Sequence, residues 1–117
     1  MFGNLFGAIK NTHMAHKVNN ILLRNYSISA PLEDVLEVLL RYPNDQNEHE
    51  LAIWYLTDWV KRIYPNHPKA ISEVTKYIRI AKTAAKNGFI NNPACGDALF
   101  IVIENRFGVD ASGVKID

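Results

Sequence analysis

The sequence has little of what stabilises secreted scaffolds. Cys95 is its one cysteine, so no disulfide can form within the chain, and a disulfide-stapled domain is excluded. No run of about 18 apolar residues occurs, so a membrane-spanning helix is not expected. In the opening stretch MFGNLFGAIK, Lys10 follows the apolar residues, the reverse of a signal peptide. These absences favour a cytoplasmic protein.

The chain is short, and its composition is balanced. It has 117 residues, of which 48% are hydrophobic and 21% are charged. Such a balance excludes collagen-like, low-complexity and wholly disordered chains. We therefore expect one globular domain with its own apolar core.

Proline positions and apolar spacing predict an all-α fold. All five prolines fall where a helix should start or stop, and between them the apolar residues recur every three or four positions. We expect a compact single-domain bundle of about five helices, with an apolar N-terminal arm at 1–11 and an irregular tail at 109–117. The expected helices are 12–25, 31–42, 46–64, 68–87 and 93–107.

Residues typical of helix ends support these boundaries. Asp45 followed by Glu48 suggests a capping box for the third helix. Gly88 and Gly108 are expected just beyond the ends of the fourth and fifth. Asn92 is expected as the N-cap of the fifth.

The segment 98–103 permits a second interpretation. It holds six consecutive apolar residues, three of them β-branched, which also suits a buried strand. We favour a helix because the caps bracket about 15 residues and because no other segment alternates to pair with a strand.

Charge is separated along the chain. Residues 31–60 contain seven acidic residues and one basic residue, whereas residues 61–90 contain seven basic and one acidic. Attraction between neighbouring helices is the simpler explanation. The alternative is two surface patches of opposite sign, which would also allow two copies to pair as a homodimer.

No catalytic, metal-binding or cofactor-binding pattern is evident. His13 and His16 would share a helical face, but a third ligand is not visible nearby. His49 and His67 add no motif. Cys95 lies in an apolar stretch, which is typical of a small core residue. We therefore predict no catalytic residue, metal ligand or cofactor.

A basic face on the fourth helix is the best-defined surface feature. At 100° per residue, five cations share an arc of about 140°. Such a face can meet phosphates or an acidic protein, although it lacks interleaved aromatic residues. Its members are Lys69, Lys76, Arg79, Lys82 and Lys86.

Trp54 is a candidate aromatic anchor on the third helix. It is predicted to point away from the apolar side, towards Glu50, Asp58 and Lys61. A tryptophan among charges is typical of a protein interface. The alternative, given equal weight, is that the N-terminal arm or another helix covers it.

The N-terminal arm has one apolar stripe if it is helical. Phe2, Leu5, Phe6 and Ile9 share that stripe. Packing on its own domain is the favoured interpretation, and docking on a partner or a membrane surface is the alternative.

These observations together predict a non-catalytic cytoplasmic protein–protein interaction module. An adaptor, an assembly subunit and an immunity-type inhibitor of a toxin or enzyme belong to this class. The first alternative is nucleic-acid binding through the basic face of 68–87. The second alternative is a small metal- or cysteine-dependent enzyme.

Overall fold

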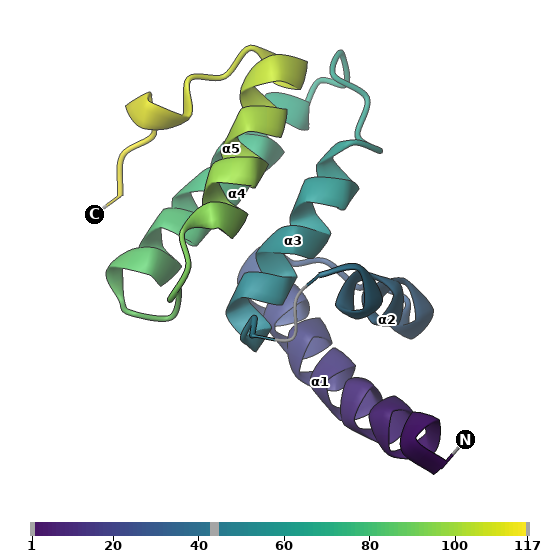
Figure 1. Cartoon of the computed structure of the whole chain (residues 1–117). Helices are drawn as coiled ribbons and strands as arrows, with labels where there is room; N and C mark the ends of the chain where they lie inside the picture. The colour runs from purple at the N-terminus through teal and green to yellow at the C-terminus, as the bar shows by residue number, and fades with distance from the viewer. Residues whose placement is uncertain (1, 43–44, 117) are drawn as a thin grey trace.

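The computed structural model describes residues 2–42 and 45–116, with side chains from residue 11 onwards. Over these residues the fold is of the all-α class, with helices joined by turns and loops. This confirms the predicted fold class. Five helices and one short 3₁₀ turn follow in order (Figure 1). They are α1 (Phe2–Tyr26), α2 (Leu32–Arg41), α3 (Glu48–Val60), α4 (Ala70–Lys86), α5 (Ala94–Phe107) and η1 (Ala111–Gly113).

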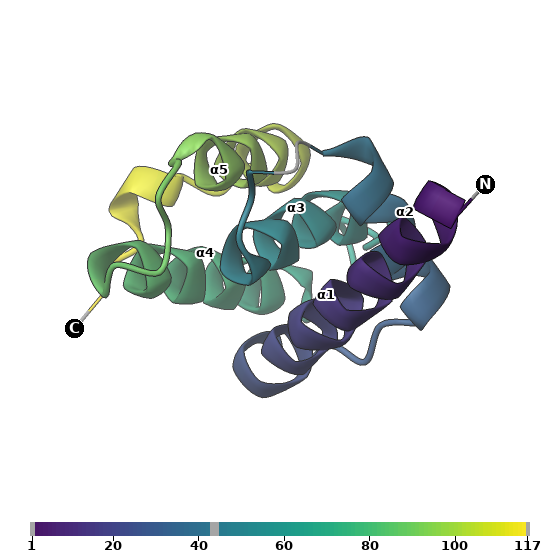
Figure 2. The ribbon, with the colours of Figure 1, turned by 60° about the horizontal axis from the view of Figure 1, so that its bottom comes forward.

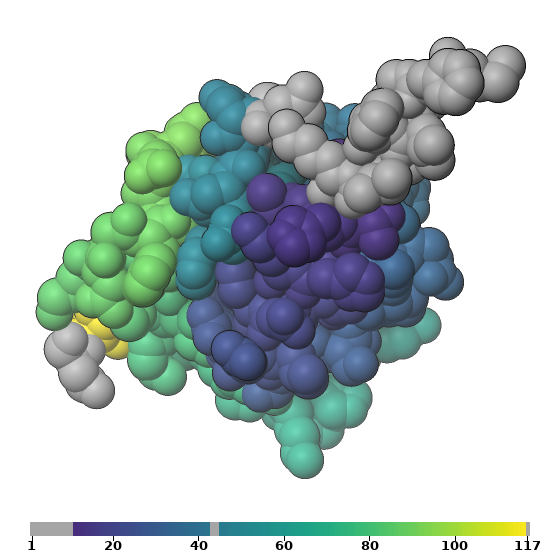
Figure 3. Space-filling view, turned by 90° about the horizontal axis from the view of Figure 1, so that it is seen from below, coloured from purple at the N-terminus to yellow at the C-terminus, as the bar shows by residue number. Residues whose placement is uncertain are grey.

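Helix α3 is the centre of the bundle. It packs against α1, α2, α4 and α5, most extensively against α5 (Figure 2). Apolar side chains point from several sides of α3 into the core. The buried ones include Leu51, Ile53, Tyr55 and Leu56. Seen from below, α1 covers the middle of the molecule, between α2 and the turn that joins α4 to α5 (Figure 3). A central helix of this kind explains how 117 residues enclose one core.

The observed helix boundaries correct several predicted ones. The predicted helix 12–25 is part of α1, which begins at Phe2, and the predicted helix 46–64 ends at Val60. There the chain tightens into i to i+3 hydrogen bonds, from Arg62 N to Trp59 O at 3.0 Å and from Ile63 N to Val60 O at 3.2 Å. The packing of the predicted arm at 1–11 remains a prediction because the side chains of residues 1–10 lie outside the described ones.

The capping of α3 differs from the prediction. Asn47, not Asp45, is the N-cap, and its side chain accepts a hydrogen bond from Glu50 N at 2.8 Å. In return, the Oε1 atom of Glu50 accepts a hydrogen bond from Asn47 N, also at 2.8 Å. The capping box therefore begins at Asn47, two residues later than expected. Asn47 and Glu50 are three residues apart, so each side chain reaches the backbone N–H of the other.

The ends of α4 and α5 largely follow the prediction. Gly88 and Gly108 have φ values of 84° and 68°, the left-handed conformation that glycine tolerates best. The segment 98–103 is part of α5, so the helical interpretation is confirmed. Pro93, rather than Asn92, is the N-cap of α5, although Asn92 Oδ1 accepts from Ala94 N at 3.0 Å.

The C-terminal tail folds back on α4. It contains η1 and packs Ala111 into the core. Lys82 Nζ donates to the carbonyls of Ala111 and Val114, at 2.5 and 2.9 Å, and Glu104 accepts from Ala111 N at 3.2 Å. Within the described residues, no helix is long and apolar enough to cross a membrane.

Candidate interaction surface

Glu50, a predicted partner-binding residue, lies inside the fold. Only 1% of its surface is exposed. One carboxylate oxygen accepts from Asn47 N, and the other accepts from Asn91 N at 2.9 Å and Asn92 N at 2.6 Å. Its charge is compensated by three backbone donors. Glu50 is therefore structural, which corrects its assignment as a partner contact.

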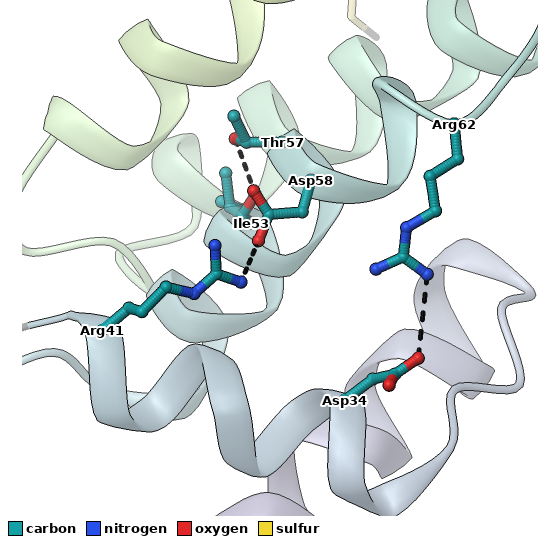
Figure 4. A network of polar contacts seen from close by, with 6 residues as sticks. All are labelled: Asp34, Arg41, Ile53, Thr57, Asp58 and Arg62. Atoms are coloured by element: carbon teal, nitrogen blue, oxygen red, sulfur yellow. Dashed lines mark hydrogen bonds and ion pairs between the residues drawn. The ribbon is translucent and has the colours of Figure 1, made fainter.

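Asp58 also contributes to the fold. It pairs with Arg41 of α2, while Asp34 of α2 pairs with Arg62 beyond the end of α3, at 3.7 Å (Figure 4). The two pairs lie along one flank of α2 and connect it to α3. Asp58, a predicted partner-binding residue, is therefore engaged by a cation of its own chain, and its contact with a partner stays a prediction.

Trp54 is half-buried rather than fully exposed. Its indole stacks on Tyr42, with ring centroids 4.3 Å apart and an interplanar angle of 17°. Its Nε1–H donates to the Oε1 atom of Gln46 at 3.0 Å. Both of these contacts come from the connection between α2 and α3. The side chains of residues 1–10, in the predicted arm, lie outside the described ones, so the packing of the arm on Trp54 stays a prediction. Lys61, the C-cap of α3, is exposed, and its contact with a partner stays a prediction.

The predicted basic face of α4 is partly occupied by the tail. Lys82 Nζ donates to two tail carbonyls, and Arg79 Nε donates to Lys115 O at 3.4 Å. Lys69 and Lys86 are exposed and Lys76 is half-buried. Because Arg79 and Lys82 hold the tail, the face does not present five unengaged cations to a nucleic acid.

The predicted core role of Cys95 agrees with its position. Its side chain is fully buried, and burial, with a further contribution from the charge of Glu50, raises the pKa of the thiol to about 11. His13 and His16 are both exposed on α1, and the His49 ring stacks on Phe89. Among the described residues, no three His, Cys, Asp or Glu side chains gather where they could hold a metal ion.

A hollow that was not predicted from the sequence lies between the end of α3 and the start of α4. This α3–α4 corner is defined by Trp59, Arg62, Tyr64, His67 and Lys69, which line a cavity of about 360 Å³. Tyr64 is 77% exposed, the highest exposure of any large hydrophobic residue that the structure describes. Tyrosine, tryptophan and arginine are the residue types that most often dominate binding energy at interfaces.

The corner is held in place by its own backbone and by α5. Arg106 Nη2 donates to Ile63 O at 2.8 Å. His67 N donates to Tyr64 O at 3.1 Å, and the Nδ1 atom of His67 accepts from Lys69 N at 3.2 Å. These bonds shape the loop before a partner arrives, which reduces the entropy lost on binding.

The chemistry of the corner is aromatic and cationic. The Arg62 guanidinium lies 5.9 Å from the centre of the Trp59 ring. Glu73 is the one acid among the described residues that line the hollow, and the hydroxyl of Tyr77 donates to it at 3.3 Å. Burial raises the pKa of Tyr77 to about 12, so this hydroxyl stays protonated at neutral pH.

A signal for this site was present in the sequence. Arg62 and Lys69 flank the proline-rich turn Tyr-Pro-Asn-His-Pro at 64–68, which begins with Tyr64. Loops placed on a rigid scaffold often carry binding residues. What the sequence did not reveal is that Trp59 turns towards the same side.

Comparison with known proteins adds no family to this description. No protein-family model, no curated protein and no solved structure matches the chain.

Proposed function

We propose that this chain is a non-catalytic protein-interaction module that binds an acidic protein segment at the α3–α4 corner. The observation that carries the proposal is Tyr64, which is 77% exposed at a preformed hollow. A tyrosine with this exposure gains apolar contact on binding and keeps its hydroxyl available for a hydrogen bond.

The charge of the corner selects the partner. Arg62 and Lys69 line the hollow and Lys61 is exposed beside it. Two acids oppose these three cations: Glu73 in the lining, and Asp34, which pairs with Arg62. Complementary charge favours an acidic segment and speeds its association, while a basic segment is repelled. The partner that fits best therefore carries carboxylates around an apolar or aromatic side chain.

The volume of the hollow sets the size of that side chain. About 360 Å³ is enough for one or two side chains and lies near the lower end of the range for small-molecule pockets. The partner would insert one apolar anchor between Trp59 and Tyr64, and its carboxylates would face the surrounding cations.

A photocrosslinking experiment tests this function. Replacing Tyr64 with p-benzoylphenylalanine in the full chain should give a crosslink to an identified protein through an acidic segment. The change Lys69→Glu should reduce the product at least about fivefold, because it reverses one charge at the hollow. Lys115→Glu, the same change in the exposed tail, should leave the product intact.

A second crosslinker position provides the spatial control. Phe89 is also exposed, at 47%, but lies beyond the far end of α4. Its replacement by p-benzoylphenylalanine should not capture the same segment. Equal capture at positions 64 and 89, or a product that Lys69→Glu leaves unchanged, would overturn the proposal.

A further inference from the structure

A second unusual surface lies on α2. Glu33, Glu37 and Leu40 are four and three residues apart, so they form one stripe along the helix, and all three are exposed, Leu40 to 76%. We name this stripe the acidic ridge. The opposite side of α2 carries Val35 and Val38, which are buried in the core. The ridge therefore presents an apolar side chain together with carboxylates, the chemistry that suits the α3–α4 corner.

The acidic ridge begins next to the α3–α4 corner. Asp34, which follows Glu33, pairs with Arg62 of the corner at 3.7 Å (Figure 4). Both side chains of this pair keep solvent contact, with exposed fractions of 32% and 54%. Two surfaces of opposite charge thus lie side by side on one molecule.

Because the two adjacent surfaces have opposite charge, the acidic ridge of one molecule is complementary to the α3–α4 corner of a second copy. A twofold axis that passes between them places the ridge of each copy over the corner of the other, so that each contact is made twice. One copy cannot make this contact within itself, because its own α2 is fixed to α3 by the pairs Arg41–Asp58 and Asp34–Arg62.

We infer that this chain forms a symmetric dimer in which the acidic ridge of each copy docks on the α3–α4 corner of its partner. Leu40 enters the hollow beside Tyr64, and Glu37 faces the partner's Lys69. The inference rests on the proposed function, since it identifies the ridge as the acidic segment that the corner binds.

Salt dependence is the first property that this dimer must show. The pairs between ridge and corner are exposed, and exposed charges are screened within about 10 Å at 0.1 M salt. In sedimentation equilibrium the full chain should show twice the monomer mass at about 100 µM and low salt. Raising the salt to about 0.5 M should weaken the association at least about tenfold.

Charge reversal identifies the two surfaces. Glu37→Lys and Lys69→Glu each place like charges opposite one another at both contacts, so each variant alone should be monomeric. In an equimolar mixture, Lys from one variant meets Glu from the other, and both contacts regain opposite charges. The mixture should therefore regain the dimer, which neither variant forms alone.

Matched controls use charges on the other side of the molecule. The control variants are Asp97→Lys on α5 and Lys115→Glu in the C-terminal tail, and both wild-type residues are exposed. Helix α5 and the tail lie away from α2 (Figure 1). Both should leave the dimer unchanged, and all variants should keep the helical circular-dichroism spectrum and melting temperature of the wild type. Equal weakening by the controls would overturn the assignment of the surfaces.

The inference and the proposed function fail in different ways. A chain that stays monomeric at low salt, or a mixture that stays monomeric, overturns the dimer. If position 64 then crosslinks an acidic segment of a different protein, the corner still binds proteins and the proposed function holds. If position 64 captures nothing that depends on Lys69, the proposed function is overturned.

Discussion

The carboxylate of Glu50 accepts a hydrogen bond from the backbone N–H of Asn92, 2.6 Å away and 42 residues later in the chain. The same side chain also accepts from the backbone of Asn47 and Asn91. One buried acid thus caps the start of α3 and holds the turn between α4 and α5. An apparent surface charge in the sequence is in fact a connection between distant segments.

Removing Glu50 should destabilise the fold strongly. Glu50→Ala removes the buried acceptor of three backbone N–H groups, and each donor left unpaired away from water costs about 1–3 kcal/mol. We expect the free energy of unfolding in urea to fall by about 3 kcal/mol or more. Glu48→Ala, two residues earlier on α3, should lower it by less than about 1 kcal/mol. Equal losses would contradict the structural role.

Trp54→Ala should lower stability rather than act only on binding. The indole stacks on Tyr42 and donates to the buried side chain of Gln46. Because the ring is half-buried, we expect the free energy of unfolding to fall by about 2 kcal/mol, which is less than for the truncation of a fully buried side chain. Trp54→Phe keeps the stacking and should lose less. Urea unfolding measures both, and an unchanged midpoint for Trp54→Ala would restore the surface-anchor interpretation.

Three glycines should respond differently to alanine. Gly96 lies in the first turn of α5, and an added Cβ would meet Phe100 at an ordinary contact distance of 3.8 Å. Gly96→Ala should therefore stabilise the protein by about 0.5–1 kcal/mol. Gly88 and Gly108 have positive φ values, so the same change should destabilise by about 1 kcal/mol. Thermal melting distinguishes these signs.

The buried thiol of Cys95 predicts a pH dependence at alkaline pH. Burial raises its pKa from 9.0 to about 11, so the folded chain keeps the proton that the unfolded chain releases above about pH 9. This stabilising contribution is complete below pH 9 and is lost as the pH rises towards 11. In the wild type, the urea midpoint should therefore decline between about pH 8.5 and 10.5, in part because of this thiol. In Cys95→Ala the decline should be smaller by the contribution of the thiol. The same slope in Cys95→Ala would contradict the assignment.

Lys82 should control the C-terminal tail without controlling the core. Lys82→Met keeps the aliphatic stem but loses both bonds to the tail carbonyls. We expect proteolysis within 109–116 to accelerate several-fold, since local opening becomes easier, while the global free energy of unfolding changes by less than about 1.5 kcal/mol. Lys76→Met serves as the control. Tail cleavage at the wild-type rate in Lys82→Met would contradict this role.

Local chemistry made most of the fold predictable. Proline cannot continue a helix, glycine accepts positive φ, and apolar residues every three or four positions need a core on one side. These rules located five helices, including α5 over 98–103, and the ends at Gly88 and Gly108. They were less accurate at starts, where Asn47 rather than Asp45 caps α3, because neighbouring polar residues compete for the same cap.

Only the tertiary structure decided which charges are available at the surface. Asp58, Glu50 and Lys82 have the same local appearance in sequence as any exposed charge, yet each binds a group 17 or more residues away. Trp59 and Tyr64 line one hollow, in which every lining residue lies within 59–77. Sequence by itself determined helices and caps, since these depend on neighbours within a few residues. The availability of these three charges depended on contacts between distant segments, which no local pattern encodes.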